Sequence, residues 1–188
     1  MNDFKNIQGK RVNRIIRISR YSIAVAAIFI LILAGYWLYI FYMLSPNKLF
    51  SENFIDIELS TLPDTAAPLE SNFEKAYRGK NYNEVIRLNA ISVLSAKEIL
   101  LSGLAYLQTD DPAKAIYSFQ MVLVDVNKER SSDLKDETEY YLALAYLKNR
   151  DFDQAIEIMN KIHDNPGHLY REKFPPSFIR RVKMLKWR

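Results

Sequence analysis

Side chains able to do chemistry are few in this chain. Its 188 residues include two histidines and no cysteine, which excludes thiolate nucleophiles, disulfides and cysteine-based metal sites. His163 and His168 flank the sequence DNPG over residues 164–167. Because a spacing of five does not place two side chains on one face of a helix, we interpret both histidines as turn residues rather than as metal ligands.

Adjacent carboxylates offer the next opportunity for chemistry. Asp110 and Asp111 would suit acid–base catalysis only with a substrate site around them, whereas Thr109 before them and Pro112 after them are typical of a helix start. The chain has five glycines and no glycine-rich phosphate loop. We therefore expect no catalytic residues, no metal and no cofactor, and we do not predict an enzyme.

Charge is distributed unevenly along the chain. The formal net charge of +4 combines +5 over residues 1–20, −7 over residues 45–170 and +6 over residues 171–188. A nucleic-acid-binding domain carries its basic surface on the folded body. We therefore expect neither a nucleic acid nor a small-molecule substrate as a partner.

Residues 21–44 are an uncharged run of 24 residues, rich in aromatic side chains. About 20 apolar residues suffice to cross a bilayer, so this run predicts a transmembrane helix. It continues for nine residues beyond the weak cleavage site at Ala34-Gly35, which favours a retained signal anchor. The cations before it predict a single-pass protein of the bacterial inner (plasma) membrane, with a cytoplasmic N-terminus and a periplasmic C-terminal domain.

Composition divides the chain into five expected parts. They are a basic cytoplasmic arm over 1–20, a transmembrane signal anchor over 21–44, a linker over 45–70, a helical repeat domain over 71–174 and a basic amphipathic helix over 175–188. In the linker, the alternating pattern of residues 54–59 predicts extended chain. That segment either docks loosely on the domain or the bilayer, or pairs with a partner as an edge strand. The last helix either caps the repeats or lies on anionic lipid headgroups.

Small and aromatic residues recur forty positions apart. The first set is Gly103, Tyr106, Ala115 and Phe119, and the second is Ala143, Tyr146 and Ala155. Small residues at these positions allow two antiparallel helices to approach closely, so each set predicts a helix–turn–helix unit. Capping-box spacings mark the starts of the first helices, at Ser71 and Glu74, at Ser95 and Glu98, and at Asp136 and Glu139.

These residues resemble the tetratricopeptide repeat family over roughly residues 66–166. The period of 40 residues exceeds that of the family, and residues 126–135 account for the difference as an insertion or a longer helix. The resemblance implies an all-α fold, in which the transmembrane helix is followed by a short tetratricopeptide-like array of about three repeats and a C-terminal capping helix. It also implies a surface for protein partners.

The first helices of such an array line a concave face. The residues expected there are Lys97, Leu100, Leu104, Leu107, Glu137, Tyr140, Leu144, Leu147 and Lys148. Their apolar members must be covered, either by neighbouring repeats and the C-terminal helix or by an extended or helical peptide that binds in a groove. Both alternatives remain open from the sequence.

The expected function combines these parts. The chain would be a membrane-anchored interaction module or scaffold acting outside the cytoplasm, for example in the assembly or export of envelope proteins. The alternative is a membrane-bound regulatory component of the anti-sigma or envelope-stress type. Its expected partners are the lipid bilayer and proteins whose identity the sequence does not give.

Overall fold

The computed structural model describes residues 25–39, 44–57, 71–91, 94–129 and 134–187. Every regular element in these ranges is a helix. The chain divides into two units, Met1–Leu44 and Ser45–Arg188. An all-α fold was expected, and the described residues agree with it.

The first unit contains one described helix, over residues 25–39, which is 15 residues long. No helix in the described ranges is long and apolar enough to cross a membrane. The predicted transmembrane helix and signal anchor over 21–44 are therefore wrong, as is the single-pass inner-membrane location. Residues 1–24 and 40–43 lie outside the described residues.

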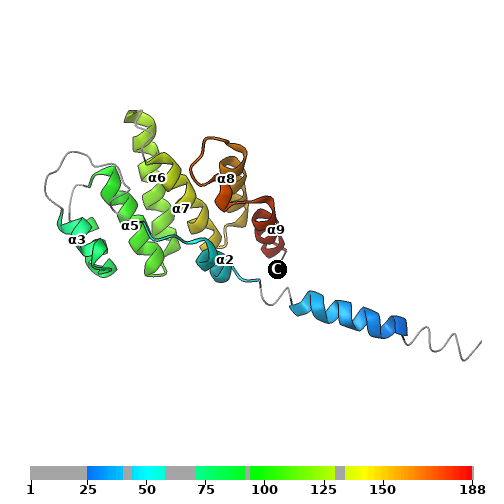
Figure 1. Ribbon diagram of the computed structural model, residues 1–188. Helices are drawn as coiled ribbons and strands as arrows, with labels where there is room; N and C mark the ends of the chain where they lie inside the picture. The colour runs from blue at the N-terminus through cyan, green and yellow to red at the C-terminus, as the bar shows by residue number, and fades with distance from the viewer. Residues whose placement is uncertain (1–24, 40–43, 58–70, 92–93, 130–133, 188) are drawn as a thin grey trace, which may run out of the picture. The chain divides into compact units, whose positions relative to one another are not determined.

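Three helical hairpins form most of the second unit (Figure 1). The first pairs α3 (Asn72–Arg78) with α4 (Tyr82–Asn89), the second α5 (Ala96–Gln108) with α6 (Pro112–Glu129), and the third α7 (Lys135–Lys148) with α8 (Phe152–Asp164). Each helix packs on the next, and the first helices of the hairpins, α3, α5 and α7, also contact one another in order. This is the stacked arrangement expected of tetratricopeptide-like repeats.

Shorter elements before and after the hairpins pack on the third hairpin and on each other. After α8, a 3-10 turn (η2, Arg171–Lys173) leads to α9 (Pro176–Leu185), which packs on α8. At the other end of the unit's sequence, α2 (Pro46–Asn53) packs on α7 and α9. From α2 the chain runs across the first helices toward α3 (Figure 1).

The turns inside the three hairpins share one backbone conformation. Lys80, Asp110 and Arg150 have positive φ values of 55°, 64° and 65°. In each turn the following N–H bonds back to a carbonyl five residues earlier: Asn81 to Ala76 at 2.9 Å, Asp111 to Tyr106 at 2.8 Å and Asp151 to Tyr146 at 2.9 Å. These are Schellman-type endings. They identify the three hairpins as structural copies, including the first one, which lacks the small and aromatic residues of the other two.

Helix starts follow the predicted caps in all but one place. Capping boxes form at Ser71 with Glu74 and at Ser95 with Glu98. The predicted box at Asp136 is wrong, because the N-cap of α7 is Leu134, two residues earlier, and makes no side-chain cap hydrogen bond. The Asp136 carboxylate instead accepts the N–H of a residue in the loop before α9.

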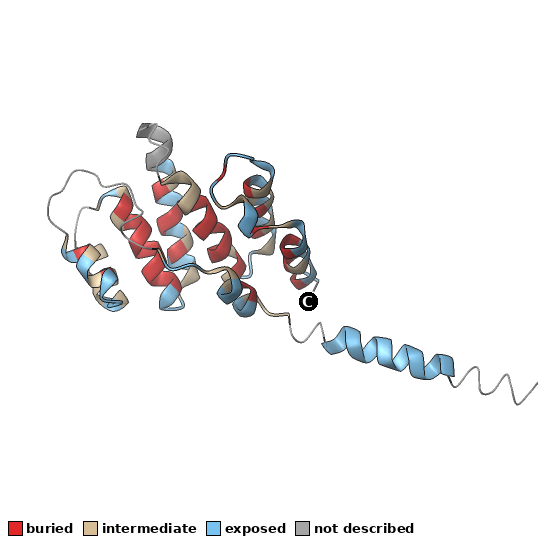
Figure 2. Cartoon of the chain, viewed as in Figure 1, coloured by how far each residue is buried: buried red, intermediate tan, exposed pale blue. Residues whose placement is uncertain are grey.

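Close packing explains the small residues of the repeat pattern. Figure 2 shows burial concentrated on α5 and α7, in the middle of the array. A Cβ on Gly103 would lie 2.4 Å from Cε1 of Phe119, which is itself fully buried. Ala115, Ala143 and Ala155 are also fully buried. A larger side chain at these positions would force neighbouring helices apart.

The two tyrosines of the repeat pattern, Tyr106 and Tyr146, make equivalent contacts between successive hairpins. Tyr106 on α5 accepts a hydrogen bond from the Asn89 amide on α4, at 3.3 Å. Forty residues later, Tyr146 on α7 accepts one from the Gln120 amide on α6, at 2.9 Å. In both cases an amide on the second helix of one hairpin bonds a hydroxyl on the first helix of the next. This polar contact therefore fixes the register between repeats.

Candidate partner-binding site

The apolar residues expected on the concave face lie together and are fully buried. They are Leu100, Leu104 and Leu107 on α5 and Tyr140, Leu144 and Leu147 on α7. Residues 45–57, named here the resident segment, lie against α7. The structure thus places a segment from a distant part of the same chain on the concave side of the repeats.

Two tyrosine hydroxyls hold the main chain of the resident segment. Tyr140 donates to the carbonyl of Asn53, and Tyr141 donates to the carbonyl of Ile55 at 2.8 Å. Asn53 is the last residue of α2, so its carbonyl has no partner within the helix. Burial raises the pKa of both tyrosines above the usual range. Both hydroxyls therefore remain protonated donors at neutral pH.

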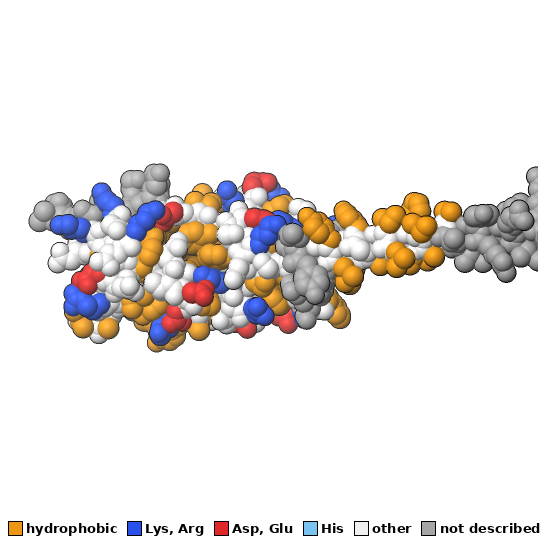
Figure 3. All heavy atoms as spheres, turned by 90° about the horizontal axis from the view of Figure 1, so that it is seen from below, with side chains coloured by type: hydrophobic (Ala, Val, Ile, Leu, Met, Phe, Trp, Pro, Cys, Tyr) orange, Lys and Arg blue, Asp and Glu red, His pale blue; other side chains and the backbone are white. Residues whose placement is uncertain are grey.

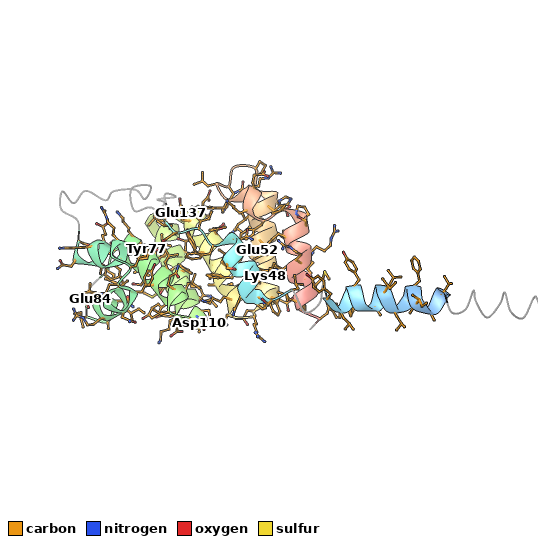
Figure 4. The ribbon with its side chains drawn as sticks, turned by 60° about the horizontal axis from the view of Figure 1, so that its bottom comes forward. Lys48, Glu52, Tyr77, Glu84, Asp110 and Glu137 are labelled. Carbon is orange, nitrogen blue, oxygen red and sulfur yellow. The ribbon has the colours of Figure 1, made fainter. Side chains whose placement is uncertain are left out.

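Side-chain contacts hold the resident segment near its acidic residues (Figure 4). The Glu52 carboxylate lies 2.8 Å from the Arg181 guanidinium on α9. The Asp56 carboxylate accepts the Tyr77 hydroxyl of α3 at 3.3 Å and lies 3.7 Å from the Lys80 ammonium. The resident segment therefore contacts the first hairpin, the third hairpin and α9.

Lys148, expected at the edge of the face, connects three elements. Its ammonium donates to the Leu107 carbonyl at the end of α5, at 2.7 Å, and pairs with Asp110 at 3.0 Å. It also lies 4.8 Å from the ring centroid of Phe50 in α2. A cation at the C-terminal end of α5 stabilises that helix, and its cation–π contact adds attraction for the aromatic ring.

The other expected edge residues have different surroundings. The Lys97 ammonium pairs with the Glu74 carboxylate at 2.7 Å, joining α5 to α3. A hydrogen bond from Lys97 is the main cause that holds the pKa of Glu74 below its usual range. Glu137 is half-buried in the first turn of α7. Lys97 therefore acts between hairpins, while Glu137 stays at the rim of the face.

A second aromatic layer supports Tyr140 from the loop after α8. The Tyr170 ring stacks on the Tyr140 ring with centroids 4.3 Å apart, and the Phe174 ring lies 5.4 Å away. Burial raises the pKa of Tyr170 to about 12. Packing against Tyr170 and Phe174 thus holds the Tyr140 ring in place.

One of the two histidines departs from the sequence interpretation. His163 lies in the last turn of α8, so its assignment to a turn is wrong, while His168 does lie in the turn that follows. The buried His168 ring lies 3.5 Å from Glu139 and 3.6 Å from Asp136. Burial is the largest influence and lowers the pKa of His168. Across the described ranges, no group of three or more histidines and carboxylates is arranged to hold a metal ion.

A separate hollow of about 540 Å³ lies between α4, α5 and α6. Its lining includes Ile99, Tyr106 and Lys114, with Tyr117 and Met121 on its outer side. Lys114 pairs with Asp111 at 2.7 Å and lies 5.5 Å from the Tyr106 ring centroid. The hollow is therefore a junction between the first two hairpins, on a different face from the resident segment.

Two parts of the site were not among the residues expected from the sequence. One is α2, whose Ser45 side chain accepts the Lys48 N–H at 3.2 Å and whose first turn contains Pro46. A serine followed by proline is a helix-start signal, so this helix was recognisable inside the expected linker. The other is Tyr141, for which neither repeat position nor spacing gave a signal.

Comparison with known proteins bears on the third hairpin. A family model described as tetratricopeptide repeat matches residues 137–168, which cover most of α7, all of α8 and the turn after it. No curated protein and no solved structure matches the chain. Residues 137–168 are thus similar to a tetratricopeptide repeat, the family that the sequence pattern resembles.

Proposed function

We propose that this chain is a protein-interaction module that binds a peptide segment of a partner on the concave face of α5 and α7. The observation that carries the proposal is the pair of hydroxyls of Tyr140 and Tyr141, which donate to the main chain of a segment distant in sequence. Peptide-binding grooves obtain affinity in this way, from main-chain hydrogen bonds flanked by side-chain pockets.

Charge and burial support the same surface. Phe50 and Leu49 of the resident segment occupy apolar positions beside α7, with Lys148 over the Phe50 ring. Arg181 and Lys80 contact the two acids of the segment, Glu52 and Asp56. The face therefore combines an apolar floor with cations at its rim, an arrangement that suits an amphipathic peptide. Figure 3 shows charged groups of both signs among hydrophobic side chains on the side seen from below.

Site-directed photo-crosslinking in cells that make the full chain tests the proposal. A photoreactive amino acid at Glu137, on the rim of the concave face, should form adducts with a small set of proteins identified by mass spectrometry. The matched control is the same amino acid at Tyr117, which is exposed on α6 beside the separate hollow. We expect the control to give no discrete adduct.

The opposite result would contradict the proposed surface. If Tyr117 gave the discrete adducts and Glu137 gave none, partner binding would belong to the face of α6. If neither position gave an adduct while both variants kept their helical circular dichroism, the chain would not act as an interaction module under those conditions.

A further inference from the structure

The resident segment is built like a bound ligand. Of residues 45–57, all of which the structure describes, only Leu49 is buried. By contrast, α5 buries ten of its 13 residues. An eight-residue helix such as α2 is too short to persist alone in water, where about 12–15 residues are needed. Its helical form therefore depends on contact with the repeats.

Main-chain contacts make the site tolerant of sequence. The hydroxyls of Tyr140 and Tyr141 bond the carbonyls of Asn53 and Ile55, at the end of α2 and in the extended chain after it. Any segment that ends a short helix and continues extended presents carbonyls at these places. The side chains of Asn53 and Ile55 are not the groups that these hydroxyls contact.

Side-chain contacts add a pattern that a ligand must match. Leu49 is the buried anchor, Glu52 meets Arg181 at 2.8 Å, and Asp56 meets Tyr77 and Lys80. The anchor and the first acid are one helical turn apart, so both contacts come from neighbouring faces of α2. The pattern is thus an apolar residue, an acid three positions later and a second acid four positions after that.

We propose that residues 45–57 are an intramolecular occupant of the concave face, and that the partner presents a segment of the same chemistry, a short amphipathic helix followed by extended chain with one acid in each part, which displaces it. This rests on the proposed function and names both the class of partner and the regulation of that site. The partner competes with a tethered occupant, so its apparent affinity is lower than the affinity of the open site.

A labelled synthetic peptide of residues 45–57 tests the proposal by fluorescence anisotropy against the full chain. The wild-type chain should bind it weakly, because its own segment occupies the site. A chain carrying Leu49→Asp and Phe50→Ala, both on α2, is named here the released chain. It should bind the peptide at least about tenfold more tightly, since the tethered competitor is lost. The milder variant Glu52→Ala should give a smaller gain and guards against misfolding of the first.

Two control arms test the chemistry of the contact. A peptide with Glu52→Arg and Asp56→Lys should not bind the released chain. A released chain with Arg181→Glu should bind the wild-type peptide less tightly, and a peptide carrying Glu52→Arg alone should restore part of that loss. Such rescue arises only if Glu52 of the peptide occupies the place that Glu52 has in the structure.

Three outcomes would overturn the inference. The first is equal peptide affinity for the wild-type and released chains, and the second is no binding to a released chain that keeps its helical circular dichroism. The third is a released or wild-type chain that dimerises with rising concentration in light scattering, which would assign the site to the segment of a second copy. If discrete Glu137 adducts persist in these cases, the proposed function stands and only the displacement idea fails.

Discussion

Gly103 illustrates how one atom can decide the spacing of two helices. Adding a Cβ there would bring it to 2.4 Å from Phe119, a ring that is fully buried and has no space to withdraw. The next hairpin has Ala143 at the equivalent position, so its helices accommodate a methyl group that the second hairpin does not.

We expect Gly103→Ala to lower the free energy of unfolding by about 1–3 kcal/mol through overpacking, although alanine favours helices. Adding Phe119→Leu, which removes the clashing ring atoms, should recover part of this loss. Urea denaturation of both single variants and the double variant measures the coupling. Gly167→Ala is the matched control, because its Cβ would lie no closer than 3.6 Å to a neighbour. An additive double variant would contradict the assigned clash.

His168 should make the free energy of unfolding depend on pH, in a direction that follows from its lowered pKa. Burial lowers its pKa in the folded state, against the opposing effect of Asp136 and Glu139. The unfolded chain therefore binds more protons just below the usual histidine pKa of about 6.5. Stability should be highest above that pH and should fall as pH decreases through the lowered folded value.

The measurement is the free energy of unfolding in urea from about pH 5 to about pH 8, the range in which histidine titrates. His168→Gln should flatten the slope, while His163→Gln should leave it in place. A slope that survives in His168→Gln would assign the titration to another group. Lys161, which pairs with Glu139 at 2.8 Å, and Tyr170 also face this histidine.

At the scale of elements, the three hairpin turns repeat one left-handed position that no glycine occupies. An L-residue there costs about 1–2 kcal/mol relative to its right-handed conformation. Asp110 pairs with Lys148, and Lys80 lies 3.7 Å from Asp56. Arg150 is exposed and is the simplest of the three positions at which to test the strain.

We expect Arg150→Gly to raise the free energy of unfolding by about 0.5–1 kcal/mol, the gain from relieved strain less the entropy of glycine. Thermal unfolding monitored by circular dichroism measures it. Arg150→Ala is the control, because alanine removes the same side chain and keeps the strain. An alanine variant as stable as the glycine variant would show that the side chain, not the backbone, is responsible.

How far the sequence predicts the structure also differs by element. The hairpins α5–α6 and α7–α8 were predictable, because caps, turn residues and small residues all lie within one local repeat. The cover over the concave face was not, because Tyr141 and Ile55 are separated by 86 positions and no periodic pattern connects them. The prediction of a transmembrane helix over 21–44 rested on hydropathy alone, and no helix in the described part of the chain is long and apolar enough to cross a membrane.

At the scale of the whole second unit, the resident segment contacts distant parts of the array. Its Asp56 reaches Tyr77 in the first hairpin, and its Glu52 reaches Arg181 on α9. Neighbouring hairpins contact mainly one another, so these are among the few ties between elements far apart along the stack.

Loss of the contacts made by the resident segment should change the radius of gyration more than the helix content. In a chain with Leu49→Asp and Phe50→Ala, small-angle scattering should give a larger radius of gyration, while circular dichroism keeps the helical signal of the repeats. Tyr117→Ala, outside the contact, should leave the radius unchanged. Unaltered scattering in the released chain would mean that the stack keeps its form without the segment.

The hydrogen bonds that Tyr106 and Tyr146 accept between successive hairpins bear on how the array could be extended. Each joins the second helix of one hairpin to the first helix of the next through the same pair of groups, an amide and a phenol. The natural building block is therefore the interval from α6 to α7, with its joint intact, rather than a single hairpin. Copies of that interval inserted in tandem would each contain the hydrogen bond between the second helix of one hairpin and the first helix of the next. We therefore expect that the array can be lengthened by duplication without redesign of its interfaces.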